Sequence, residues 1–315
     1  MKRLGQVLLA LVLLVLLALT GFVALSWAPD RSLAELKPRW APQPSQFVAS
    51  QGMLVHLRDQ GRRDDPAPLV FLHGTSASLH TWEAWAAALK GERRVISLDL
   101  PGFGLTGPFP DGDYRIEHYS RFLAALLEQL QVPRVTLAGN SFGGQLAWQF
   151  AVDYPQRVER LVLIDAAGYP RNATSVPIGF RLAQIPALAP LMANLLPRAM
   201  IAASVRSVYG EPDKVSAALI DRYYELILRA GNREALRQRF AQVPAGAGHA
   251  RIAELQVPTL ILWGGRDGLI PADNAERFKR DIAGSRLVLF DDLGHVPHEE
   301  DPARTVAVVR AFLAE

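Results

Sequence analysis

A serine stands among three glycines in GNSFGG, residues 139–144. The preceding letters RVTLA are typical of a strand, and the following QLAWQFAVDY are typical of a helix. The pattern G-x-S-x-G between a strand and a helix forms a nucleophile elbow, a turn so sharp that the serine takes a strained backbone and lifts its hydroxyl above the sheet. Glycines are needed beside it because a Cβ there would collide with neighbouring backbone. We therefore predict that Ser141 is a nucleophile.

A serine nucleophile needs a base, and the base needs an acid that orients it. His295 follows the last apolar run, in LGHVPHEEDP, and Asp267 follows the run before it, in WGGRDGLIP. In a parallel sheet all three residues would lie at the carboxyl ends of strands, on the same edge. The predicted triad is therefore Ser141, Asp267 and His295. His298 as the base and Asp165 as a substitute acid remain alternatives.

This arrangement requires a parallel sheet whose strands alternate with helices. Continuous apolar runs predict buried strands within residues 68–74, 94–102, 134–141, 159–168, 258–267 and 286–295. Helical patterns occupy residues 81–89, 116–130, 145–154, 274–281 and 302–313. Residues 45–49 and 53–58 predict a β-hairpin. The alternation predicts a doubly wound, mostly parallel α/β sheet.

One interval interrupts this alternation. Residues 169–256 contain no convincing strand and several prolines, which predicts a helical cap inserted into a core of residues 45–168 and 257–315. The first half of the cap, residues 169–210, has four arginines and no acidic residue; they are Arg171, Arg181, Arg198 and Arg206. Its apolar face either packs on the core domain or faces anionic lipid.

The first 28 residues predict a membrane anchor. Residues 4–27 carry no charge, and 24 helical residues span roughly 36 Å, enough to cross a bilayer core. The alternative is a cleaved signal peptide with a site at Ala24-x-Ser26. Lys2 and Arg3 would keep the N-terminus cytoplasmic and place the remainder across the membrane, in the periplasm of a Gram-negative bacterium. Residues 29–44 predict a juxtamembrane linker near the headgroups or a plain tether.

The chain from about Ser45 to its end resembles the α/β-hydrolase superfamily in its capped esterase and lipase branch. The likeness rests on HG at 73–74, DLPGFG at 99–104, the elbow, WGGRD and GHVPHEEDP. With its anchor, the whole chain also resembles bacterial single-pass membrane-anchored esterases and phospholipases A. The resemblance implies an oxyanion hole made by the amide of Phe142 and that of Thr75, with Ser76 as the alternative to Thr75.

The composition narrows the function classes. The chain of 315 residues has a formal net charge of +3, so a nucleic-acid partner is not expected. It has no cysteine, which excludes disulfides, thiolate metal sites and cysteine nucleophiles. The histidines show no H-x-H or H-E-x-x-H spacing, so neither a metal nor another cofactor is expected. Thr20 and Ala24 stand four apart, which makes a homodimer through the anchor possible.

The expected function is a membrane-anchored serine carboxylic-ester hydrolase. It would release fatty acid from acyl esters, with membrane phospholipids or lysophospholipids as partners, through an acyl-enzyme on Ser141. The alternatives are a small-molecule hydrolase, which cleaves carbon–carbon bonds or acts as a perhydrolase, and a non-catalytic binding protein. The triad residues disfavour the last, because silent members of such folds usually lose one of them.

Overall fold

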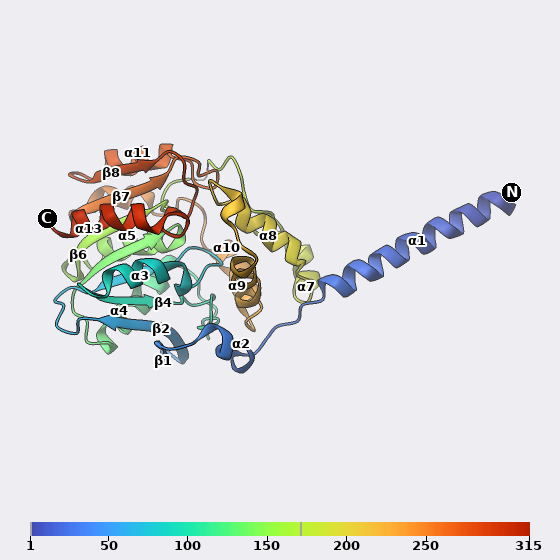
Figure 1. Ribbon diagram of the computed structural model, residues 1–315, viewed down its shortest axis with the longest axis horizontal. Coiled ribbons are helices and arrows are strands. Elements are labelled where there is room, and N and C mark those ends of the chain that lie inside the picture. The colour runs from blue at the N-terminus through green and yellow to red at the C-terminus, as the bar shows by residue number, and fades with distance from the viewer. Residues whose placement is uncertain (1, 171) are drawn as a thin grey trace.

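An eight-stranded sheet forms the centre of the computed structural model, which describes residues 2–170 and 172–315 (Figure 1). The strand order is β1-β2-β4-β3-β5-β6-β7-β8, and only β1 and β2 run antiparallel to their neighbours. The strands are β1 Ser45–Ser50, β2 Met53–Gly61, β3 Leu69–Leu72, β4 Arg94–Leu98, β5 Val135–Asn140, β6 Val158–Ile164, β7 Thr259–Gly264 and β8 Arg286–Phe290. The predicted α/β fold class is confirmed.

Helices cover both faces of the sheet because alternate strand residues point to opposite sides. In β3, Leu69 and Phe71 join one core cluster, while Val70 and Leu72 join the other. The first cluster includes residues of α3 Glu83–Leu89 and α13 Pro302–Leu313; the second includes residues of α4 Ile116–Gln129, α5 Phe142–Asp153 and α11 Asp273–Asp281. Short helices complete the domain: η1 Leu79–Trp82, η2 Pro155–Arg157 and α12 Pro297–Glu300. Two apolar layers therefore hold the strand ends rigidly.

Helices fill the interval between β6 and β7, and we call residues 169–256 the cap. Its elements are α6 Ile178–Ala183, η3 Pro186–Leu188, α7 Ala189–Met192, α8 Arg198–Arg206, η4 Pro212–Lys214, α9 Ala217–Ile227, α10 Asn232–Gln242 and η5 His249–Glu254. Ile201 and Val205 of α8 pack with Ile220 of α9 and with Val296 of the core. The two helices thus bury apolar residues mainly against each other, while Ile178, Ile185 and Leu191 of the cap remain exposed. Of the four arginines noted in the sequence, Arg171 lies outside the described residues.

The helix α1, Lys2–Ser26, projects from the domain beside α7 (Figure 1). Within the described residues it is the one helix long and apolar enough to cross a membrane, a criterion that a signal sequence also meets. Its carboxyl end is attached to the cap: the Leu196 amide donates to the Ser26 carbonyl at 2.8 Å, and the Ala28 amide donates to the Asn194 carbonyl at 2.8 Å. The cap and α1 are therefore direct neighbours.

The segment after α1 is docked on the cap and core. Asp30 forms an ion pair with Arg233 of α10 at 2.6 Å. The short helix α2, Leu33–Trp40, starts with a capping box between Ser32 and Glu35 and continues through Pro38. The capping box between Ser32 and Glu35 contributes about 1 kcal/mol to the stability of α2. Leu36 is fully buried, and its burial contributes about 2 kcal/mol to the stability of the fold.

The same segment is held at its far end by Trp40. Its indole donates to Glu225 of α9 at 2.7 Å, and its carbonyl oxygen accepts from Nε2 of the buried His80 at 2.8 Å. The residues between α1 and β1 therefore form part of the folded domain, and the interpretation of a plain tether is wrong.

Two buried histidines make the stability of this domain sensitive to acid. His298 packs flat on Trp82 with ring centres 4.2 Å apart, and its Nε2 is 3.1 Å from Oγ1 of Thr81. Burial lowers the pKa of His298 to about 3 and the pKa of His80 to about 4. The unfolded chain takes up these protons below about pH 6.5, so the stabilisation is complete above that pH and is lost as the pH falls toward 4 and then 3.

We predict that the melting temperature of the detergent-solubilised protein falls between pH 6.5 and pH 4. In His298→Gln the decline should be shallower, because one proton fewer distinguishes the unfolded from the folded chain. His249→Gln, which changes an exposed histidine of the cap, serves as the control and should follow the wild type. Parallel pH profiles for His298→Gln and the wild type would show that His298 does not contribute.

Candidate active site

Ser141 occupies a strained turn between β5 and α5. Its backbone has φ 55° and ψ −117°, a region that side chains other than glycine rarely adopt and that costs about 1–3 kcal/mol. A Cβ on Gly139 would overlap the carbonyl of Gly143, and a Cβ on Gly143 would overlap the carbonyl of Leu72. The glycines that flank Ser141 are therefore required by close backbone contacts, and the turn has the geometry of a nucleophile elbow.

The structure brings Asp267 and His295 into direct contact. The Nδ1 atom of His295 lies 2.6 Å from Oδ2 of Asp267, and both side chains are buried. The other oxygen of Asp267 accepts hydrogen bonds from the amides of Leu269 at 2.8 Å and Ile270 at 2.9 Å. This arrangement fixes the carboxylate and the imidazole, and leaves Nε2 of His295 available to the cavity that His295 and Ser141 both line.

The loop that carries His295 is held by the elbow and by the cap. The side-chain amide of Asn140, next to Ser141, donates to the His295 carbonyl at 2.9 Å. The His295 amide donates to the carbonyl of Val208 in the cap at 2.8 Å. The three predicted triad residues thus share one sheet edge, and the cap helps to place the histidine.

Asp165 lies beside this pair as a buried carboxyl group. One of its oxygens accepts from the Gly264 amide at 2.9 Å. Burial, and then the charge of Asp267, raise the pKa of Asp165 well above its usual range. One side-chain oxygen of Asp165, one of Asp267 and one ring nitrogen of His295 lie within 4.8 Å of one another, so three potential metal ligands meet here. The raised pKa of Asp165 and the hydrogen bond between His295 and Asp267 fit a cluster that shares protons. His295 bonds to Asp267, which is the acid that the sequence predicts, and not to Asp165.

His298 lies away from the cavity although it is only three residues from His295. It is fully buried beside Thr81 and Trp82 and lines neither of the two cavities that contain Ser141. The alternative in which His298 is the base is therefore wrong.

The amides predicted to bind an oxyanion lie on both sides of Ser141. Phe142 is the first residue of α5, so its amide has no acceptor within the helix. The loop containing Thr75 passes against the nucleophile, since a Cβ on Gly74 would lie 3.2 Å from the Cβ of Ser141. Within residues 2–170 and 172–315, the amides of Thr75 and Phe142 donate to no backbone carbonyl. Ser76, the alternative to Thr75, has φ 61° and also lines the cavity.

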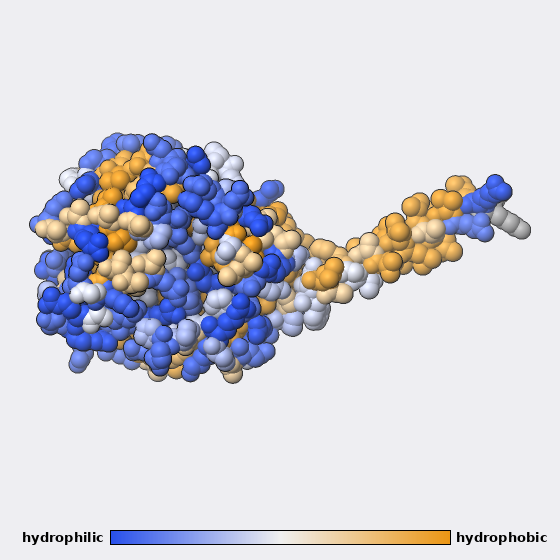
Figure 2. All heavy atoms as spheres, viewed as in Figure 1, coloured by the Kyte–Doolittle hydropathy of each residue, from blue (hydrophilic) through white to orange (hydrophobic). Residues whose placement is uncertain are grey.

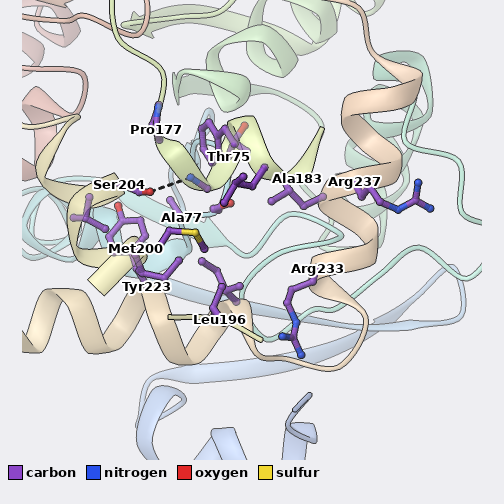
Figure 3. Close-up of a pocket in the computed structure, with 18 of the residues that line it drawn as sticks. Thr75, Ala77, Pro177, Ala183, Leu196, Met200, Ser204, Tyr223, Arg233 and Arg237 are labelled. Carbon is purple, nitrogen blue, oxygen red and sulfur yellow. Dashed lines mark hydrogen bonds between the residues drawn. The ribbon is translucent and has the colours of Figure 1, made fainter. Parts of the chain in front are cut away.

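Two cavities meet at Ser141. The larger has a volume of about 200 Å³ and contains His295 and an apolar wall from the cap that includes Ala183, Ile185, Leu196, Met200, Ile201 and Val205. Figure 3 shows this wall. Arg233 and Arg237 lie on one helix, and their guanidinium groups point away from the apolar wall. The smaller cavity, about 110 Å³, is lined by Thr75, Phe142 and Arg239 and by the polar side chains of Gln145 and Asn274.

Residues 67–302 match the family model described as alpha/beta hydrolase fold. The chain belongs to this family. Among its relatives is the 2-hydroxy-6-oxo-2,4-heptadienoate hydrolase of Pseudomonas putida, 32% identical over 85% of this chain and 95% of that protein. The 2-hydroxymuconate semialdehyde hydrolase of a Pseudomonas species is 30% identical over 88% of this α/β-hydrolase and 96% of that one.

Solved structures show the same α/β-hydrolase fold. The meta-cleavage product hydrolase of Pseudomonas fluorescens has a TM-score of 0.73 at 24% identity, over 85% of this chain and 97% of that chain. A bacterial membrane phospholipase A also has a TM-score of 0.73 at 24% identity, over 100% of this chain and 98% of that chain.

Sequence reasoning missed two residues of this α/β-hydrolase site. Asn140 stands inside the elbow, but nothing in its position shows that its amide holds the distant histidine loop. Arg239 lies in RQRFAQ of α10, a polar stretch with no motif, and its Nη2 donates to Oγ1 of Thr75 at 2.8 Å. Only the packing of the cap on the core reveals these contacts.

We predict different outcomes for the two neighbouring carboxyl groups. Asp267→Asn should lower kcat for a soluble ester by about 10⁴-fold, because the imidazole loses its orienting carboxylate. Asp165→Asn replaces a carboxyl group, whose pKa is raised, by an amide of the same shape, and it should keep kcat within about fivefold of the wild type. Steady-state kinetics on the purified full chain make the comparison, and an equal loss in both variants would contradict these assignments.

Proposed function

We propose that the protein is a membrane-anchored serine hydrolase that releases fatty acid from phospholipids or lysophospholipids. Ser141 is the nucleophile, His295 the base and Asp267 the acid that orients His295. The amides of Thr75 and Phe142 bind the oxyanion, and each contributes about 3–4 kcal/mol of transition-state stabilisation.

The apolar cavity is the observation that carries this proposal. It begins at Ser141 and His295 and extends along the cap to Met192, Ala193 and Leu196. Leu196 is hydrogen-bonded to Ser26 at the carboxyl end of α1. A fatty acyl chain matches such a lining, since burying each CH₂ group contributes about 0.8 kcal/mol. The cavity therefore leads from the nucleophile toward the base of the anchor.

The surface of the cap around this point supports a lipid partner. Ile178 is 37% exposed, Ile185 is 44% exposed and Leu191 is 54% exposed. Figure 2 shows the apolar surface of α1 continuing onto the part of the domain beside it. The match of the membrane phospholipase A structure to the full length of this chain agrees with an anchor that is retained. We place the N-terminus in the cytoplasm and the catalytic domain on the far side of the membrane, the periplasm in a Gram-negative bacterium.

The reaction follows from these positions. Nε2 of His295 takes the hydroxyl proton of Ser141 as the oxygen attacks the ester carbonyl. The carbonyl oxygen becomes negative beside the amides of Thr75 and Phe142, and the alcohol leaves with the proton from His295. Water then loses a proton to His295 and attacks the acyl group on Ser141. The bond between the acyl carbon and the Ser141 oxygen breaks, His295 returns its proton to that oxygen, and the fatty acid is released.

A second candidate is the hydrolysis of a carbon–carbon bond in a small keto acid. The two Pseudomonas relatives, 30% and 32% identical, carry names of this kind. The apolar wall of the larger cavity and the docked anchor favour the ester of a lipid.

A substrate panel tests the proposed function. The detergent-purified full chain and Ser141→Ala are assayed on acyl esters of increasing chain length, phospholipid, lysophospholipid and a 2-hydroxy-6-oxo-dienoate. We predict release of fatty acid from the lipids by the wild type, with at least about a 10³-fold loss in Ser141→Ala. Turnover of the dienoate alone would favour the second candidate, and lipid hydrolysis by Ser141→Ala would contradict the proposal.

We also predict that the exposed face of the cap contributes to activity on a bilayer. Leu191→Gln should lower hydrolysis of vesicle phospholipid by about threefold or more, because the cap loses an apolar contact with the membrane. Hydrolysis of a short soluble ester should not change. Leu54→Gln is the matched control, since Leu54 is 50% exposed on β2 of the core. Equal effects of the two variants on vesicles would exclude a lipid contact at Leu191.

A further inference from the structure

One arginine of the cap touches both residues assigned to the oxyanion hole. Arg239 lies in α10 and is 6% exposed. Its Nη2 donates to Oγ1 of Thr75 at 2.8 Å, and its guanidinium carbon lies 4.3 Å from the centre of the Phe142 ring. Thr75 follows β3 and Phe142 follows β5, so a single side chain joins two separate loops.

The guanidinium is held in place by a set of aromatic rings. Besides Phe142, its carbon lies 5.0 Å from the ring of Phe240 and 5.9 Å from the ring of Phe103. A planar cation stacks on such faces and at the same time donates in its own plane. Arginine meets both requirements, whereas the compact ammonium group of lysine cannot stack in this way.

The helix that presents Arg239 is fixed to the core at both ends. At its start, Nδ2 of Asn232 donates to the carbonyl of Gly104 at 3.0 Å. At its end, Oε1 of Gln242 accepts from the amide of Tyr114 at 2.7 Å. The position of Arg239 relative to Ser141 is thus set by the docking of the cap.

We propose that Arg239 is a positioning residue that holds the Thr75 loop and the Phe142 end of α5 at the spacing the oxyanion requires. The proposal rests on the function proposed above, in which Ser141 forms a tetrahedral intermediate. Arg239 acts through the two residues, since the oxyanion is bound by their backbone amides. The cap then has a part in the chemistry as well as in covering the cavity, because a cap that leaves the core takes Arg239 with it.

The test compares Arg239→Met, Arg239→Lys and Thr75→Val in the full-length protein on a soluble ester. Arg239→Met should lower kcat by about 10- to 100-fold, the cost of a small misplacement in an oxyanion hole, with KM changed less than about threefold. Arg239→Lys keeps a hydrogen-bond donor, so its kcat should lie between that of Arg239→Met and that of the wild type. Thr75→Val keeps the backbone amide of residue 75 and removes the hydroxyl group that accepts the hydrogen bond from Arg239.

A double-mutant cycle separates positioning from general stability. Adding Thr75→Val to Arg239→Met should produce little further loss of kcat, because the hydrogen bond is already absent. A trifluoromethyl ketone, which forms a tetrahedral adduct with a serine nucleophile, should bind more weakly to Arg239→Met by the same factor as kcat/KM falls. Arg198→Met, which removes a cap arginine that lines neither cavity, is the control and should retain kcat.

Three outcomes would overturn the proposal about Arg239. They are an unchanged kcat in Arg239→Met, independent losses in the cycle, and inhibitor binding that does not follow kcat/KM. If Arg239→Met does not fold, Thr75→Val and Arg239→Lys carry the same test. Ser141→Ala separates a failure of the proposed function from a failure of the proposal about Arg239. Activity in Ser141→Ala would contradict the proposed function itself. An inactive Ser141→Ala together with a fully active Arg239→Met would contradict only the role of Arg239.

Discussion

At Ser141 the chain passes from β5 into α5 through a backbone conformation that costs about 1–3 kcal/mol, and the packing around it compensates for that cost. Gly139 and Gly143 allow the carbonyls of neighbouring segments to approach within distances that a Cβ would prevent. Ser141 lines both cavities, and Phe142, the first residue of α5, lines the smaller one. The remaining residues of the site are arranged around this turn, which the sheet and α5 hold from both sides.

The cap contacts three parts of the chain around the site: the His295 loop, the residues Thr75 and Phe142, and the end of α1. Its Val208 carbonyl holds the amide of His295, its Arg239 contacts Thr75 and Phe142, and its residues 194–196 are bonded to the end of α1. The Ser141 turn, the His295 loop and the end of α1 are therefore joined through the cap by hydrogen bonds and packing contacts. Any movement of the cap therefore alters the surroundings of His295, Thr75 and Phe142.

The sequence predicts the fold and the proximity of Asp267 and His295 because both depend on local patterns. Continuous apolar runs identify the parallel strands, and residues that follow such runs meet at one sheet edge. The prediction of a strained serine follows from the glycine spacing alone. The helix predicted over residues 145–154 begins earlier, at Phe142, because the glycines of the turn interrupt the periodic pattern there.

The remaining contacts join residues that are distant in the sequence and carry no pattern. Asp30 meets Arg233, Trp40 meets His80, and Arg239 meets Thr75. Each depends on how the cap and the segment after α1 dock on the core, which no spacing in the chain encodes. His298 shows the same limit, since it lies only three residues from His295 yet packs on Trp82 and lines neither cavity that contains Ser141.

The proposed function requires that an acyl group of a lipid is covalently attached to Ser141 during turnover. The most direct measurement is rapid quenching of the full-length protein during turnover of phospholipid vesicles, followed by mass spectrometry of its peptides. We predict that the peptide containing Ser141 carries the mass of a fatty acyl group, and that the adduct disappears as the substrate is exhausted. Release of fatty acid with no acyl adduct on that peptide, or an adduct on another residue, would contradict it.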